Sequence, residues 1–369
     1  FSRNGALLID GDKVKLRTID ERLAILSLNF GQNVLKESNA FELILDQEED
    51  LNGMPEGIKD AAAETAKQRG YEGKWVFTLD YPSYIPFMTY CENRELRKQM
   101  YLAFGSKAYK DNEQNNTGLI KELVKLRLER ANLLRYDSHA DYVLEERMAK
   151  NASAVKSFLD ELEEKAMPFA QKEFATLQNF AQELDDIERL EKWDTSFYTE
   201  KLKKQELDLD DELLRPYFQL EKVVEGVFET AERLYKIRFN INKEIDVYHP
   251  DVTAYEVTDT SGKHIAVFYA DFFPRPGKRQ GAWMTSYRSQ YKNGDEEVRP
   301  LVSIVCNFTK PTSKKPSLLT FNEVTTLFHE FGHALHGMLA NGTYASLSGT
   351  SVYWDFVELP SQILENWCY

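Results

Sequence analysis

Cysteine is scarce in this chain, with three among 369 residues. Cys91, Cys306 and Cys368 lie far apart, and none belongs to a CxxC pair. We therefore expect neither a disulfide scaffold nor a zinc site built on thiolates. The same scarcity favours a reducing compartment, and we expect a cytoplasmic protein. Because the chain begins with Phe1 rather than Met, a periplasmic protein whose signal peptide has been removed is the alternative.

Long apolar runs and an excess of basic residues are also absent. No apolar run approaches the roughly 18 residues that a membrane-spanning helix needs. The 60 acidic residues outnumber the 46 basic ones, which gives a formal net charge of −14. Nucleic-acid binding requires the opposite, a basic face. We expect a monomer with no nucleic-acid partner and no membrane partner.

Helical periodicity extends from residue 13 to about residue 240. Apolar residues recur three and four positions apart, which is typical of a helix with one buried stripe. The first such stripe comprises Leu16, Ile19, Leu23, Leu26 and Phe30. A second follows a cap at Asn151 or Ser153 and comprises Val155, Phe158, Leu162, Phe169, Phe174, Leu177 and Leu184.

The pattern changes near residue 245. Alternating apolar and polar residues on both sides of a Thr-Ser-Gly turn predict a β-hairpin in "AYEVTDTSGKHIAVFYADFF", and "LVSIVCNF" (301–308) predicts another strand. Two helices follow, one through 326–339 and one around 354–367. The expected fold is mainly α with a small β-sheet, divided into a helical domain (1–244) and a second region (245–369).

Half of the six histidines lie in "TLFHEFGHALHGML", residues 326–339. His329, Glu330 and His333 form an HExxH motif. Side chains four residues apart on a helix lie one above the other, so both imidazoles can reach one metal ion. Glu330 lies about 100° further round the helix, where a general base for an attacking water belongs. The alternative is an accidental motif in a helical scaffold.

A zinc site needs a third protein ligand. His336 is about 10 Å along the helix axis from His329, too far to share the ion, and is expected to support the site or to pack. A further histidine at position 339 would mark another class of zinc peptidase, but Leu339 stands there.

Glu358 is the better third ligand, because it lies 25 positions after His333 on the next predicted helix. Asp355 and Gln362 lie three residues before it and four after it, so they share its face. A glutamate from a second antiparallel helix, with a neighbouring carboxylate that orients an imidazole, is the gluzincin arrangement.

Several segments in this order resemble the thimet oligopeptidase family of zinc peptidases, and best of all its bacterial peptidyl-dipeptidase and oligopeptidase A branch. They lie between residues 267 and 369 and read "FYADFFPRPGKRQGAWM", "IVCNFTKP", "FHEFGHALHGML" and "GTSVYWDFVELPSQILENW". The resemblance implies one zinc ion on His329, His333 and Glu358, with Glu330 as the base. It also implies a zincin-like catalytic half, a helical domain, and a deep channel that admits short unstructured peptides.

By the same resemblance, strand 301–308 lies near the zinc and a peptide lies along its edge. Gly349, Cys306 and Asn307 are the expected substrate contacts. The expected activity is release of C-terminal dipeptides, and an endo-acting oligopeptidase is the alternative. Release of dipeptides needs a cation for the free carboxylate. Lys278, Arg279 and Arg288 are candidates, although surface charges are the favoured interpretation of all three.

One departure from the family concerns the end of the chain. Family members continue past the "ENW" segment with a Gly-rich stretch that carries tyrosines and a histidine, whereas this chain ends at Tyr369. We expect a fragment, a processed chain or a chain from which a second piece is missing. A non-catalytic fragment that binds zinc or peptide therefore stays open as an alternative.

Overall fold

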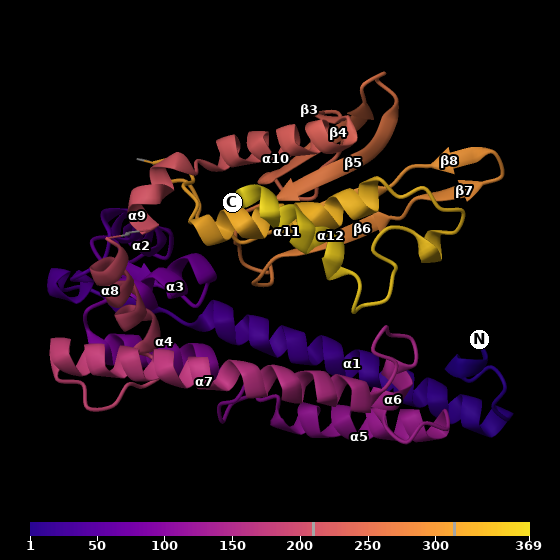
Figure 1. The fold of residues 1–369 in the computed structure, drawn as a ribbon, viewed down its shortest axis with the longest axis horizontal. Coiled ribbons are helices and arrows are strands. Elements are labelled where there is room, and N and C mark those ends of the chain that lie inside the picture. Colours follow the sequence, from indigo (N-terminus) through magenta and orange to yellow (C-terminus); the bar gives the residue numbers. More distant parts are fainter. Residues whose placement is uncertain (209–210, 313–314) are drawn as a thin grey trace. The chain divides into compact units, whose positions relative to one another are not determined.

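The computed structural model describes residues 1–208, 211–312 and 315–369 (Figure 1). Its α-helices are α1 (Asp10–Ala40), α2 (Glu56–Gln68), α3 (Tyr81–Tyr90), α4 (Arg94–Gly105), α5 (Thr117–Leu133), α6 (His139–Leu144), α7 (Ala152–Asp185), α8 (Thr195–Leu207), α9 (Asp211–Leu214), α10 (Leu220–Tyr235), α11 (Phe321–Met338) and α12 (Glu358–Glu365). Its strands are β1 (Leu43–Leu45), β2 (Trp75–Phe77), β3 (Ile237–Ile241), β4 (Val252–Asp259), β5 (His264–Asp271), β6 (Trp283–Arg288), β7 (Tyr291–Asn293), β8 (Glu296–Val298) and β9 (Leu301–Val305).

The chain forms two compact units. The first comprises Phe1–Leu43 and Asn93–Thr199, and the second comprises Ile44–Glu92 and Glu200–Tyr369. A mainly α fold with a small sheet is confirmed. The units group residues 44–92 and 200–244 with the C-terminal region, and the domain division after residue 244 stays a prediction, as does the substrate channel. No described helix is long and apolar enough to cross a membrane.

The long helix α7 begins where the sequence predicts, but its predicted stripe is not buried. The Asn151 side chain accepts a hydrogen bond of 2.8 Å from the backbone N–H of Ala154, which caps the helix. Of the predicted stripe, Leu177 is buried, whereas Phe158 and Phe169 are 65% and 70% exposed. Periodicity correctly identified a helix, but it does not say whether another element covers the apolar face.

The second unit is built on a five-stranded sheet with the order β3-β4-β5-β9-β6. The predicted hairpin is confirmed, since β4 and β5 pair antiparallel on both sides of the turn. Alternate residues of neighbouring strands face one core, as the two-residue period of a strand requires. Phe268 of β5 pairs with Val302 of β9, and both are buried against apolar residues of α10 and α11.

The strand predicted at 301–308 lies inside this sheet. β9 (Leu301–Val305) pairs with β5 in parallel and with β6 antiparallel. Both edges of β9 itself are therefore already hydrogen-bonded, and peptide binding along an edge of the sheet near this strand stays a prediction. β6 occupies the outer position on that side, a strand that the sequence analysis did not predict.

A buried ion pair organises the first unit. The Asp194 carboxylate is fully buried and accepts hydrogen bonds from Arg94 Nη2 at 2.7 Å and from Arg97 Nη2 at 3.0 Å. Burial raises the pKa of Asp194, but these hydrogen bonds and that from the Glu191 N–H outweigh it and hold the pKa below its usual value. Arg97 is itself 1% exposed and lies 4.0 Å above the Phe197 ring.

We predict that Asp194→Ala lowers the free energy of unfolding by about 3–5 kcal/mol, because it removes the carboxylate that Arg94 and the buried Arg97 share. Since the folded pKa of Asp194 is depressed, the ion pair stabilises above the unfolded pKa of about 3.9 and is lost as pH falls through the folded pKa. Urea unfolding between pH 7 and pH 3 measures both effects. Asp10→Ala, at a carboxylate that is fully exposed, is the control and should change stability by less than about 0.5 kcal/mol. Equal losses in the two variants would contradict the prediction.

Candidate metal centre

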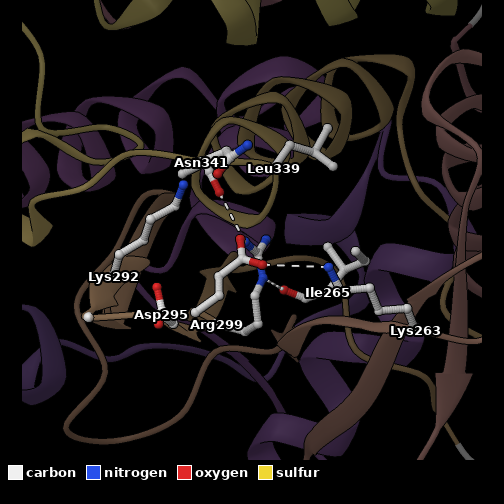
Figure 2. A pocket seen from close by; sticks show the side chains of 10 residues that line it. Lys263, Ile265, Lys292, Asp295, Arg299, Leu339 and Asn341 are labelled. Atoms are coloured by element: carbon white, nitrogen blue, oxygen red, sulfur yellow. Dashed lines mark hydrogen bonds and ion pairs between the residues drawn. The ribbon is translucent and has the colours of Figure 1, made fainter.

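The helix that carries the HExxH motif is fixed at both ends. At its N-terminus Thr320 and Glu323 form a capping box, in which the Glu323 N–H donates to Thr320 Oγ1 at 3.1 Å and the Thr320 N–H donates to Glu323 Oε2 at 2.8 Å. At its C-terminus Arg299, which Figure 2 labels, donates to the carbonyl oxygen of Ala340 at 3.1 Å. Arg299 also donates to the carbonyl oxygen of Met338 at 2.7 Å. These carbonyls have no partner within the helix, so Arg299 satisfies them and ties α11 to the sheet.

Three side chains converge beside α11. Glu358 Oε2 lies 3.1 Å from His329 Nε2 and 3.0 Å from His333 Nε2. One donor atom from each of the three residues lies within 4.8 Å of the others. The two imidazole rings meet edge to face, with centroids 5.0 Å apart. The four-residue spacing and the glutamate 25 positions later therefore place these groups together, as the sequence indicated.

The absence of a side chain at Gly332 allows α11 and α12 to approach this closely. A Cβ atom there would lie 2.6 Å from the Cα of Ser361 and 2.8 Å from the carbonyl oxygen of Pro360. Both neighbours are backbone atoms, so they cannot move away as a flexible side chain could. Gly332, the residue before His333 in the HExxH motif, thus sets the separation of α11 and α12.

Glu358 is the first residue of α12 and is held by its own helix. Ser361 Oγ, which is fully buried, donates to Glu358 Oε2 at 2.8 Å. Burial raises the pKa of Glu358, but this hydrogen bond and the neighbouring His333 and His329 outweigh it and hold the pKa below its usual value. The carboxylate is therefore ionised at neutral pH, as a metal ligand must be.

Burial shifts the pKa values of Glu330 and His333 in the direction that favours their neutral forms. Glu330 is 6% exposed, and burial together with the nearby Glu358 raises its pKa to about 7, against a lowering effect of His329. Its Oε2 atom is buried without a hydrogen-bond partner among the described residues. Burial lowers the pKa of His333, which favours the neutral imidazole that binds metals.

These groups fit a zinc ion. Zinc in tetrahedral coordination, with nitrogen and oxygen ligands at roughly 2.0–2.2 Å, keeps its ligand atoms about 3.3 Å apart. The separations of 3.1 and 3.0 Å between the carboxylate and the two imidazoles are close to that value. A nearby cation would also offset the cost of burying Glu330, whose Oε2 lacks a partner. The donor set of two imidazoles and one carboxylate is one that zinc accepts in catalytic sites.

Comparison with known protein families gives a match over most of this chain. The model of the family described as "Peptidase family M3" matches residues 87–369. This chain belongs to peptidase family M3. The family that the sequence segments resembled is thereby confirmed.

Curated M3 relatives share more than a third of the residues. Oligopeptidase A of Escherichia coli is 40% identical over 375 residues, which cover 100% of this chain and 55% of that protein. Oligopeptidase A of Haemophilus influenzae is 38% identical with the same coverage. Dipeptidyl carboxypeptidase of E. coli is 37% identical over 368 residues, covering 100% of this chain and 54% of that protein. The chain thus spans about half the length of the curated relatives it matches.

The sequence analysis missed Glu365, which supports the metal group in this M3 chain. Its Oε1 atom lies 2.6 Å from His329 Nδ1, so it orients the ring with Nε2 toward Glu358. The sequence could have indicated this role, because Glu365 lies seven residues after Glu358. Seven residues make about two helical turns, so both side chains lie on the same face. Asp355 lies instead in the turn before α12, and both Asp355 and Gln362 are exposed. Their supporting roles stay predictions.

Two other predicted residues lie in α11 or against it. His336 is half-buried, is not part of the three-residue metal group, and has a buried Nδ1 without a partner in the described chain. Gly349 has a φ of +56°, and a Cβ there would lie 3.0 Å from the Cα of Gly337. Glycine is thus needed for the turn and for contact with α11, and its predicted contact with a peptide stays a prediction.

Cys306 and Asn307 follow β9. Cys306 is fully buried in the core, and its backbone N–H donates to the carbonyl oxygen of Asp271 at 2.8 Å. Asn307 Nδ2 donates to the carbonyl oxygens of Arg279 at 3.0 Å and Gly281 at 2.7 Å, which fixes the loop before β6. Substrate binding by either residue stays a prediction.

The surface-charge interpretation is wrong for Lys278. Its side chain is 4% exposed, and Nζ donates to the buried Asp271 carboxylate at 2.9 Å and to the Phe273 carbonyl at 2.7 Å. Burial lowers the pKa of Lys278, although Asp271 opposes this. The sequence of the loop around Lys278 does not indicate that its side chain pairs with the buried Asp271. Arg279 and Arg288 are exposed, as expected.

We predict that Gly332→Ala weakens zinc binding at least about ten-fold, because α11 and α12 must separate to admit the methyl group. Zinc affinity is measured by competition with a chromophoric chelator. Gly226→Ala on α10, where an added Cβ meets nothing within 4 Å, is the matched control and should leave affinity unchanged. Unaltered zinc affinity in Gly332→Ala would show that the helix separation does not set the metal site.

Proposed function

We propose that the complete protein is a zinc-dependent oligopeptidase that hydrolyses short unstructured peptides. The observation that carries this proposal is the convergence of His329, His333 and Glu358 beside the buried Glu330, in a chain of peptidase family M3. In this proposal the three converging residues hold one zinc ion. A monomer working in the cytoplasm is proposed with it.

Zinc, when bound, would supply a Lewis acid that polarises the scissile carbonyl. Glu330 would take a proton from the attacking water and later deliver it to the leaving amine. Its buried position next to His329, beside the group of three converging side chains, supports this role. Glu365 would keep the His329 ring oriented during the reaction.

We further propose that cleavage releases C-terminal dipeptides. One of the matched relatives is named a dipeptidyl carboxypeptidase, whereas others are named oligopeptidase A. Lys278 is already bound to Asp271, so Arg279 and Arg288 are the cations left for a substrate carboxylate among the three considered. Endo-acting cleavage is the second candidate, because Lys278 is paired with Asp271 and is not available to bind the carboxylate of a substrate.

Replacing Glu330 by Gln should leave zinc bound but lower kcat by about 10²–10⁴-fold, because the variant cannot accept the proton. Metal content after dialysis and hydrolysis of a quenched fluorescent peptide measure the two properties. Glu296→Gln, an exposed residue of β8, is the control and should behave as the parent protein. Parental turnover in Glu330→Gln would remove its assigned role. Absence of stoichiometric zinc from the parent would favour an accidental motif, and zinc without turnover would favour a non-catalytic binding protein.

Release of dipeptides predicts that amidation of the substrate's C-terminus lowers kcat/KM by at least about 10²-fold, because the amide cannot form the ion pair that the free carboxylate would form. Mass spectrometry of the products from free and amidated peptides of one sequence provides the measurement. Equal rates, with cleavage at internal bonds, would establish the endo-acting alternative.

A further inference from the structure

A pocket of about 580 Å³ lies within the second unit, against the first turns of α11. Its lining includes Asn322, Thr325 and Thr326 of α11. Thr325 precedes His329 by four residues and Thr326 precedes it by three, so both share the face of the helix that carries the metal group. Four residues correspond to about 6 Å along the axis. The pocket therefore begins one turn from the candidate metal centre.

Aromatic rings supply much of the wall of this pocket. Tyr81 and Tyr90 contribute from α3, Phe308 from the chain after β9, and Phe321 from the start of α11. Such rings pack against the methylene stem of a long side chain and attract a cation placed over their faces. A purely apolar ligand would pack against the rings but would gain nothing from their attraction for a cation.

Carboxylates exceed cations along another part of the wall. Glu200 and Asp211 both line the pocket and share one lysine, Lys203, at 2.8 and 2.7 Å. Arg215 pairs with Glu212 at 2.7 Å, which neutralises one further carboxylate. Among the residues that the structure describes, one negative charge of the pair Glu200 and Asp211 therefore has no cation of its own.

Glu323 adds to this excess. It lines the pocket and accepts hydrogen bonds from the backbone N–H groups of Thr309 at 3.1 Å and Thr320 at 2.8 Å. Both donors are neutral amides, and the positive end of the α11 dipole offsets only part of the charge of this carboxylate. Aromatic walls combined with uncompensated carboxylates match a long side chain that ends in a positive charge.

We propose that this pocket binds a lysine or arginine side chain of the peptide substrate, about two or three residues from the cleaved bond. That distance follows from the 6 Å separation and from an extended rise of about 3.3 Å per residue. The inference rests on the proposed peptidase function and adds a preference for basic peptides.

Binding to the complete zinc-loaded protein with Glu330→Gln tests the proposal without turnover. The probes are fluorescent peptides with lysine or its neutral analogue norleucine two or three residues from the cleaved bond. We expect the lysine peptide to bind about ten-fold more tightly than the norleucine peptide. Adding Glu200→Gln and Asp211→Asn should reduce that ratio to below about two-fold and leave norleucine binding unchanged.

The matched control adds Asp295→Asn and Glu296→Gln, which remove two exposed charges at the β7–β8 turn beside the pocket of Figure 2. The lysine preference should survive there, which excludes an effect of net charge alone. Equal binding of the two peptides by the parent, or a preference that persists without Glu200 and Asp211, would overturn the proposal. Failure of zinc-loaded protein with Glu330 intact to cleave any peptide would overturn the proposed function instead.

Discussion

The close contact between α11 and α12 at Gly332 is the constraint on which the candidate metal centre depends. His329 and His333 meet because they share one helix, but Glu358 reaches them only if a second helix lies at the correct distance. Backbone atoms of Pro360 and Ser361 occupy the space that a side chain at position 332 would fill. Backbone contact fixes this distance more tightly than apolar side chains can, since side chains adapt by changing rotamer.

Much of the candidate metal centre could be predicted because its residues lie at short, regular spacings in the sequence. Positions i and i+4 of a helix share a face wherever that helix is placed, so His329 and His333 needed no tertiary information. Glu358 was assigned because it lies on the helix predicted around residues 354–367. The same predicted helix contains Glu365. The boundary of α12 was less accurate, and Asp355 therefore lies in a turn and not on the helical face where it was expected.

The features that the sequence analysis missed share a different cause, which is dependence on partners distant in sequence. Nothing near β9 in the chain indicates that β6 will pair with its outer edge. The burial of Lys278 depends on Asp271, whose carboxylate is enclosed only after the sheet has formed. Likewise, the apolar residues of α7, such as Phe169, define a helix without defining what covers it. Local patterns specify elements, and the assembled sheet decides which charges become buried.

The charge of the chain and the charges at the pocket act over different distances. A formal charge of −14 acts on an approaching peptide, but physiological salt screens exposed charges beyond about 8 Å. The overall charge therefore affects how often peptides arrive more than which peptide is held. In the proposed pocket Glu323 would contact the substrate directly, and two backbone N–H groups already fix its carboxylate, so this side chain need not be ordered when a cation binds. Under the proposal, selection among peptides would depend on the few carboxylates that line this pocket, whereas the remaining acidic surface would contribute a weak and salt-dependent background.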